Sequence, residues 1–219
     1  MISVELVGVS GVGKSFLANK IAQNTQSYKI FKTRFLIFSI IPAAVISCMW
    51  LIPYLNRSGY SLRSLRQYKY FIKYISYILF IKFSKSASGY IFDQGPIYLL
   101  ALLYSRNNLN LKSKEYILHL ATSHFKLSSD NFKIICLKTP SRQLLLDKVH
   151  KRSKNNVLKI YEKSKVDDFF HRWTTSYDYV LSIDNIKQIN TIELENDYKS
   201  SFALVNKSLN FIGVTTSDG

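Results

Sequence analysis

Residues Gly8 to Ser15 combine glycine, lysine and serine at a spacing that suits the binding of a nucleoside triphosphate. They fit the pattern G-x-x-x-x-G-K-[ST] at every fixed position. Glycines let backbone N–H groups turn inward around the β-phosphate, the Lys14 ammonium reaches the β and γ oxygens, and the Ser15 hydroxyl can ligate Mg²⁺. We therefore expect ATP and Mg²⁺ to be bound here, with contacts from Gly8, Val9, Ser10, Gly11, Val12, Gly13, Lys14, Ser15 and Phe16.

A carboxylate that could complete this chemistry is Asp93. It follows an apolar run that predicts a strand, and Gly95-Pro96 then begins a helix. The carboxyl edge of an open parallel sheet is where ligands bind. Asp93 could hold Mg²⁺ together with Ser15, or accept the proton of an acceptor hydroxyl during phosphoryl transfer. The alternative is that Asp93 caps the helix; we favour function, because the chain before it holds only one other carboxylate, Glu5.

Cations form the third candidate element. Lys148 and Arg152 lie four residues apart, on one face of a predicted helix. Mobile cations that close over a triphosphate would neutralise charge on the transferred group and exclude water. We therefore expect a lid over 139–156, in which Lys148 and Arg152 join Lys14 and Asp93 as catalytic residues. The alternative is a solvated basic face.

Alternating strands and helices must position these residues. The apolar run 2–7 predicts a strand before the loop, and the segment from Ser15 to Gln23 predicts a helix after it. Such alternation implies right-handed crossovers and a parallel sheet covered on both faces, an α/β three-layer class in a single domain over 1–219. The other predicted strands are 28–34, 89–93, 132–138 and 188–194. The other predicted helices are 96–106, 112–127, 141–152, 156–181 and 197–210, with a helical insert at 35–86.

The charge of the chain is strongly positive and unevenly spread. Its formal net charge is +16 over 219 residues, and no carboxylate occurs between Glu5 and Asp93. The cations gathered over 57–85 indicate an anionic partner, either membrane phospholipid or, less favoured, nucleic acid, unless they form a solvated face. Cys48 and Cys136 lie in apolar stretches and give no disulfide framework. We therefore expect buried thiols and a cytoplasmic location, with peripheral contact to the membrane.

The uncharged stretch 35–55 is long enough to cross a bilayer, which takes about 20 residues. A single crossing would place two strands of one sheet on opposite sides of the membrane, and Lys73 and Lys82 leave no room for a second crossing. We therefore expect a helical insert that packs on the core or lies in the membrane interface. In the second case Arg66, Lys69 and Lys73 would face phosphate head groups.

In this order the elements resemble the nucleoside and nucleotide kinase group of the P-loop kinases, with a layout like thymidylate kinase. The resemblance covers nearly the whole chain and is specific at the loop. In that group an acidic residue at the strand end is followed by arginine, and the lid carries two arginines separated by three residues. Here Asp93 is followed by Gln94, and Lys148 and Arg152 match the lid with one exchange. The resemblance implies ATP-dependent phosphoryl transfer to a polar small-molecule acceptor, whose identity stays open: a nucleotide, a sugar, a lipid-linked intermediate or another metabolite.

Three hypotheses follow. The first is a small-molecule kinase, with Arg34, Arg57 or Arg106 in contact with the acceptor. The second is an ATP-regulated module or ATPase that docks by its basic aromatic insert on a membrane or nucleic acid, and the third is a polynucleotide kinase. The sequence contains no N-K-x-D and no L-S-G-G-Q, which counts against a GTPase and a transporter ATPase.

Overall fold

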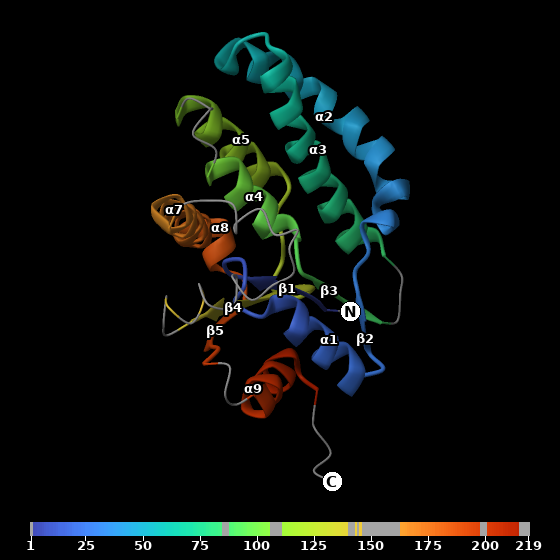
Figure 1. Ribbon diagram of the computed structural model, residues 1–219. Helices are drawn as coiled ribbons and strands as arrows, with labels where there is room; N and C mark the ends of the chain where they lie inside the picture. The colour runs from blue at the N-terminus through green and yellow to red at the C-terminus, as the bar shows by residue number, and fades with distance from the viewer. Residues whose placement is uncertain are drawn as a thin grey trace.

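The computed structural model describes residues 2–84, 88–105, 111–139, 143, 145, 163–197 and 201–214. Within them a five-stranded parallel sheet with the order β2-β3-β1-β4-β5 lies between two layers of helices (Figure 1). This confirms the predicted α/β three-layer class. The strands are β1 (Ser3–Val7), β2 (Tyr28–Ile30), β3 (Gly89–Phe92), β4 (Phe132–Lys138) and β5 (Thr191–Glu195).

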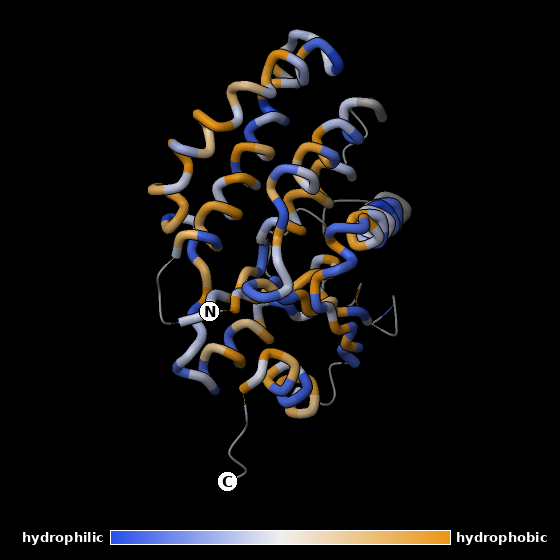
Figure 2. Tube along the Cα trace, turned by 180° about the vertical axis from the view of Figure 1, so that it is seen from behind, coloured by the Kyte–Doolittle hydropathy of each residue, from blue (hydrophilic) through white to orange (hydrophobic). Residues whose placement is uncertain are grey.

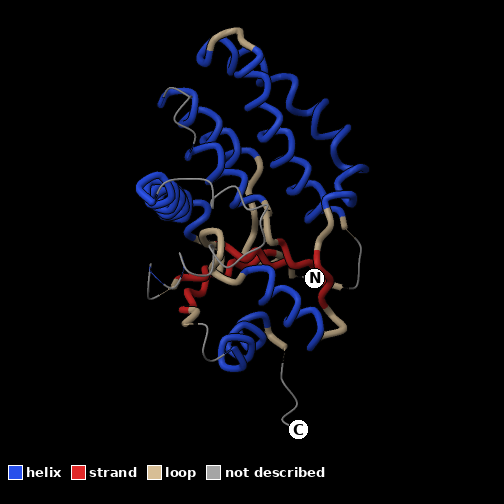
Figure 3. Tube along the Cα trace, viewed as in Figure 1, coloured by secondary structure: helices blue, strands red, loops and turns tan. Residues whose placement is uncertain are grey.

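The two faces of the sheet carry separate hydrophobic cores, because alternate residues of each strand point to opposite faces. On β4, Ile135 and Leu137 pack in one core, and Ile134 and Cys136 in the other. The first core is covered by α1 (Lys14–Asn24) and α9 (Ser201–Ile212), as Figure 3 shows below the sheet. The second core is covered by α3 (Leu62–Phe83), α4 (Pro96–Ser105), α5 (Leu111–His124), α7 (Lys163–Ser182) and the short α8 (Asp184–Lys187).

Two strands, β2 and β5, differ from their predicted bounds by three residues or more. β2 ends at Ile30 rather than at 34, because a 3₁₀ helix, η1 (Thr33–Leu36), turns the chain away from the sheet. Phe31 lies where the chain leaves the sheet. The centroid of its ring is 4.6 Å from that of Phe92 and 5.3 Å from that of Tyr77. β5 begins three residues later than predicted, because α8 and a turn occupy the preceding segment.

The predicted helical insert consists of two helices, α2 (Ile37–Ser58) and α3, which pack against each other as a hairpin. Gly59 follows α2 with φ of 84°, a conformation that glycine adopts without strain. Ser61 then caps α3, because its hydroxyl accepts a hydrogen bond of 3.1 Å from the Ser64 N–H. These two local signals divide the long apolar region.

The two helices of this hairpin differ in burial. α3 packs into the protein core through large residues that include Phe71, Tyr74 and Tyr77. α2 is the outermost helix, and its tube in Figure 2 is predominantly orange, the colour of apolar residues. Thr33–Ser58 is the one helix of the described ranges that is long and apolar enough to span a membrane. Cys48 on α2 is exposed, so the prediction of buried thiols is wrong for Cys48, whereas Cys136 is buried as expected.

Candidate active site

The loop from Gly8 to Gly13 joins the central strand β1 to α1. Its bends rely on positive φ angles, 95° at Gly11 and 101° at Gly13. The N–H of Leu17 donates to the Gly13 carbonyl at 3.0 Å, so the helix begins directly at the loop. A helix N-terminus carries partial positive charge and inward N–H groups, which favours an anionic group at this position.

Asn196, directly after β5, holds this loop from the side. Its side-chain amide donates a hydrogen bond of 2.8 Å to the carbonyl of Val12, and Asn196 is buried. A Cβ added to Gly13 would lie 2.5 Å from the Asn196 amide nitrogen, so a larger residue there would have to displace the Asn196 side chain. Sequence reasoning missed Asn196. Its position at the carboxyl end of a strand, where ligand sites form, is the signal that could have found it.

The Lys14 ammonium lies at the first turn of the loop. It donates hydrogen bonds of 2.7 Å to the Gly8 carbonyl and 3.1 Å to the Val9 carbonyl. This places a positive charge at the rim of the cavity that the loop borders. Two other members of the predicted set lie elsewhere: Val12 is buried in the core beneath the loop, and Phe16 is exposed on α1.

Ser15 and Asp93 meet across the sheet edge, although they belong to different elements. The Ser15 hydroxyl donates a hydrogen bond of 2.7 Å to Asp93 Oδ2. Adjacent ligands of an octahedral Mg²⁺ ion, with bonds of about 2.1 Å, lie ~3 Å apart, so this pair fits two positions around one ion. The described part of the chain has no cluster of three His, Cys, Asp or Glu. Mg²⁺ usually keeps several waters and substrate phosphates among its ligands.

Glu5, and not Asp93, caps the N-terminus of α4. Its fully buried carboxyl group on β1 accepts backbone hydrogen bonds from Gly95 at 3.0 Å, Ile97 at 2.8 Å and Tyr98 at 2.7 Å. Burial, with a smaller contribution from the nearby Asp93, raises the pKa of Glu5 to about 8, against the lowering effect of these three donors. The cap fixes the start of α4 beside Asp93, a role that sequence reasoning missed.

A cavity of about 320 Å³ opens between the loop and Asp93. Its far wall is aromatic: Trp173 of α7 stacks on Tyr98 of α4, with ring centroids 5.2 Å apart and an angle of 15°. Phe169, Trp173 and Tyr177 are four residues apart along α7 and all line the cavity. Sequence reasoning missed this wall, and the spacing of these aromatic residues, which puts them on one face of a helix, is the signal that could have found it.

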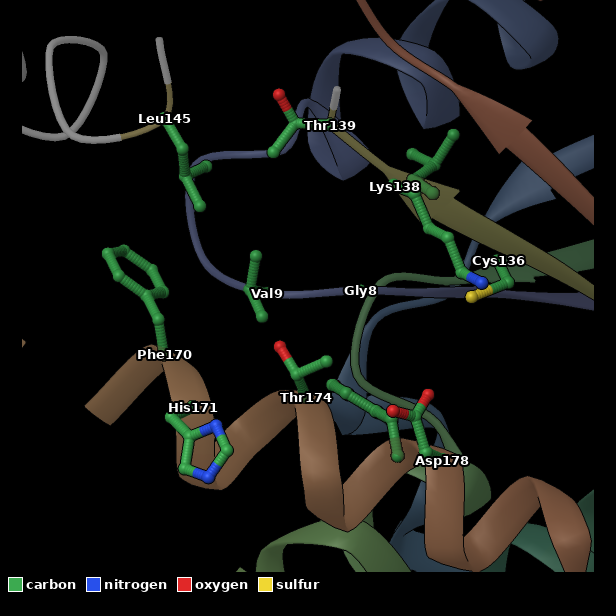
Figure 4. Close-up of a pocket in the computed structure, with 12 residues that line it drawn as sticks. Gly8, Val9, Cys136, Lys138, Thr139, Leu145, Phe170, His171, Thr174 and Asp178 are labelled. Atoms are coloured by element: carbon green, nitrogen blue, oxygen red, sulfur yellow. The ribbon is translucent and has the colours of Figure 1, made fainter. Parts of the chain in front are cut away.

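A second cavity, of about 440 Å³, lies on the other side of Gly8 and Val9. Figure 4 shows Thr174 and Asp178 projecting from α7 toward this part of the loop, with Lys138 and Thr139 opposite. Tyr177 lines both cavities, which therefore flank the first turn of the loop. The arrangement leaves room for groups on both sides of a phosphate chain bound at the loop.

Several predicted residues are not brought to this site. Arg34 and Arg57 do not line the cavity beside Asp93; the Arg34 guanidinium lies 5.6 Å from the Phe35 ring and that of Arg57 lies 4.1 Å from the Tyr116 ring. Gln94 lines the cavity, and its carbonyl accepts a hydrogen bond of 2.8 Å from the Tyr77 hydroxyl. The predicted lid residues Lys148 and Arg152, and also Arg106, lie outside the described residues.

Comparison with known proteins identifies the fold. No protein-family model matches the sequence, and no curated protein matches it. A deoxyadenosine kinase from M. mycoides with dCMP and a flexible dCDP bound superposes with a TM-score of 0.60 at 16% identity, over 95% of this chain and 99% of that chain. Its structure with bound dATP gives 0.59 at 16% identity, over 95% and 100%. The thymidine kinase EHV4-TK complexed with Thy and ADP gives 0.51 at 10% identity, over 96% and 90%. The chain thus has the fold of the P-loop nucleoside kinases, as the resemblance implied.

Proposed function

We propose that this chain, which has the fold of the P-loop nucleoside kinases, is an ATP-dependent kinase that phosphorylates a hydroxyl of a nucleoside-type acceptor. The observation that carries the proposal is the 2.7 Å hydrogen bond between Ser15 and Asp93. It places a carboxylate at the mouth of a phosphate-binding loop, in a cavity with an aromatic wall.

Each polar group of the site has a chemical role in this proposal. Lys14 and the loop N–H groups hold the β- and γ-phosphates. Ser15 and Asp93 would hold Mg²⁺, which neutralises charge on the bridging phosphates when bound. The second oxygen of Asp93 accepts the proton of the acceptor hydroxyl as the new bond to the γ-phosphorus forms. The bond from the γ-phosphorus to the β–γ bridging oxygen breaks, so that ADP leaves and the proton later passes to solvent.

The aromatic wall suggests the kind of acceptor. The ring pair of Trp173 and Tyr98 presents a flat apolar surface, against which a planar base could stack. Gln94 supplies an amide that can donate to and accept from the edge of a base. The structural neighbours are named as a deoxyadenosine kinase and a thymidine kinase, which agrees with a nucleoside-type acceptor.

The lid remains part of this proposal. The segment that carries Lys148 and Arg152 connects Thr139 to α7, and both Thr139 and α7 border the 440 Å³ cavity. We expect the cations of this segment to close over the triphosphate. They would then neutralise the transferred group and exclude water.

The decisive experiment is a screen of acceptors with γ-labelled ATP and Mg²⁺. Deoxynucleosides and ribonucleosides form the first panel, and nucleoside monophosphates, sugars and lipid-linked sugars form the second. Label that moves to a member of the first panel supports the proposal. Transfer to the second panel alone would show that the chain is a kinase, but it would refute a nucleoside hydroxyl as the acceptor. Release of inorganic phosphate without transfer, stimulated by vesicles or by DNA, would instead favour an ATPase module.

A further inference from the structure

The outward face of α2 is an exposed stripe of large apolar side chains. Its members recur every three or four residues along the helix and have exposed fractions between 63% and 90%. No charged residue interrupts the chain between Arg34 and Arg57. A continuous apolar patch of this kind marks an interaction site in a folded protein. The stripe consists of Ile37, Phe38, Ile41, Val45, Met49 and Ile52.

The inward face of α2 has the opposite character, which makes the exposed stripe harder to explain in water. Ser39, Ala43 and Ser47 are the small residues that α2 buries against its neighbours. They let α3 approach closely, so that the Tyr68 hydroxyl donates a hydrogen bond of 2.5 Å to the Ser47 carbonyl. A surface helix in water normally turns its large apolar residues to the core. From Ser39 to Ser47 this order is reversed in α2, whereas Tyr54 and Leu55 near its end are buried in the usual way.

A groove of about 430 Å³ opens beside the stripe, between α2 and the end of α3. Phe38 belongs both to the stripe and to the groove. The lining is almost entirely apolar and comes from Phe35, Phe38, Pro42, Ile46, Phe80 and Phe83. A groove of this composition suits a flexible hydrocarbon chain.

Charge around the stripe identifies its partner. Lys32 and Arg34 precede α2 and Arg57 ends it, and all three side chains are exposed. No carboxylate occurs anywhere between Glu5 and Asp93, so the charged side chains of the hairpin are all cations. A second copy of the chain would bring cations against cations. Phosphate head groups with acyl chains beneath them complement both the stripe and its ends.

We propose that α2 lies in the plane of an anionic phospholipid surface, with the stripe in the head-group and acyl boundary and an acyl chain in the groove. The helix does not span the bilayer, because its inward face packs on α3 and the flanking strands β2 and β3 pair with each other. Tyr68, Tyr74 and Tyr77 of α3 are buried in the protein core and do not take part in this surface. This surface is separate from the proposed kinase site and does not rest on it.

The apolar contribution is tested by sedimentation of the full chain with vesicles of phosphatidylcholine, with and without 30% phosphatidylglycerol. The wild type should bind the anionic vesicles. The triple variant Phe38→Ser, Ile41→Ser, Val45→Ser should bind on the order of 10²-fold more weakly. Phe202→Ser, which changes an exposed residue of α9 on the other side of the sheet, should bind like the wild type. All three side chains of the variant are exposed, so its thermal unfolding should match that of the wild type.

The charge contribution has its own matched pair. Lys32→Gln with Arg34→Gln removes two cations beside the stripe and should weaken binding about 30-fold at low salt, at ~1 kcal/mol per cation. Lys20→Gln with Lys207→Gln removes two exposed cations from α1 and α9 and should have little effect. Equal losses in the two pairs would show that only net charge matters and would overturn the assignment to α2.

The depth of insertion can be read from Cys48, which is exposed on α2 beside the stripe. Burial raises the pKa of the Cys136 thiol to about 11, so a nitroxide label should react at Cys48 alone. With anionic vesicles the label should become accessible to oxygen and protected from a polar nickel complex. Absence of vesicle binding by the wild type would overturn the proposal. So would a stable dimer that the triple variant converts to monomer without lipid, because a second copy would then cover the stripe.

Discussion

Ser15 and Asp93 are 78 residues apart in the chain, yet the serine hydroxyl donates a hydrogen bond of 2.7 Å to the aspartate carboxylate. The sheet order explains this meeting. β3 lies directly beside β1, so the residue after β3 arrives next to the helix that starts beyond the loop of β1. A carboxylate and a hydroxyl that share one hydrogen bond can also share one metal ion.

Asp93→Asn should retain ATP binding and lose on the order of 10² or more in the rate of phosphoryl transfer. The amide keeps the size of the side chain but can neither accept the proton nor attract a cation. Single-turnover kinetics with labelled ATP, beside an ATP binding curve, measures the two effects separately. Asp184→Asn at an exposed position serves as the control. If Asp93→Asn kept near-full activity with each acceptor that the wild type uses, Asp93 would have no catalytic role.

Lys14→Ala and Ser15→Ala should each abolish turnover while the fold remains intact. Both side chains border the cavity rather than the core, so their removal leaves no void in the hydrophobic interior. Circular dichroism and thermal unfolding check the fold, and labelled ATP checks activity. Lys20→Ala, on the solvent side of the same helix, should retain activity. Activity in Lys14→Ala comparable to the wild type would refute the assignment of the phosphate site.

Gly13→Ala should disrupt the loop, because the residue has φ of 101° and its Cβ would meet the Asn196 amide at 2.5 Å. We expect lower stability by about 1–3 kcal/mol and a loss of ATP affinity. Gly213→Ala is the matched control: φ is 84° there but nothing lies within 4 Å of the added Cβ. Gly213→Ala should lower stability through backbone strain but should leave the ATP affinity unchanged.

Asn196→Ala removes the hydrogen bond to the Val12 carbonyl and should cost about 1–3 kcal/mol, because a buried carbonyl then lacks its partner. In the double variant with Gly13→Ala the clash is absent. The losses of unfolding free energy in the two single variants should therefore add up to more than the loss in the double variant, as measured by urea unfolding. Strict additivity would mean that the two residues do not contact each other.

Sequence alone could predict the residues whose spacing repeats a known chemical pattern and the order of strands and helices. It could not predict Glu5 as a cap, because a carboxylate inside a buried strand has no local partner and meets α4 only through the sheet. The roles of Asn196 and of the aromatic wall could not be predicted for the same reason, because their contacts join residues that are far apart in the sequence. The sequence also could not predict which face of α2 is exposed, because both faces are uncharged and only packing distinguishes them.

The stability of the fold should depend on the protonation of Glu5. Its pKa is about 8 in the folded chain and 4.5 in the unfolded chain, so the folded state binds more protons between these values. The free energy of unfolding should therefore fall as the pH rises from about 4.5 to about 8, by an amount on the order of a few kcal/mol. Glu5→Gln cannot titrate, so the wild type minus the variant isolates this group from the histidines. A difference that is constant across this pH range would contradict the prediction.

Trp173→Ala should raise the KM for the acceptor roughly tenfold or more and leave the KM for ATP nearly unchanged, because its ring belongs to the wall opposite the loop. Trp173→Phe keeps an aromatic surface and should recover most of the loss. Steady-state kinetics with each substrate varied in turn provides the measurement. An equal rise in both KM values would indicate that α7 has moved as a whole.

The two tryptophans of the chain lie in the two regions that matter most. Trp173 stacks on Tyr98 beside the loop, whereas Trp50 packs 5.4 Å from Phe125 and 5.5 Å from His124, where α2 meets α5. Variants that keep one indole each therefore convert intrinsic fluorescence into two independent optical reporters. The Trp173 indole would report ligands that enter the cavity, and the Trp50 indole would report the proposed lipid contact of the hairpin, without any added dye.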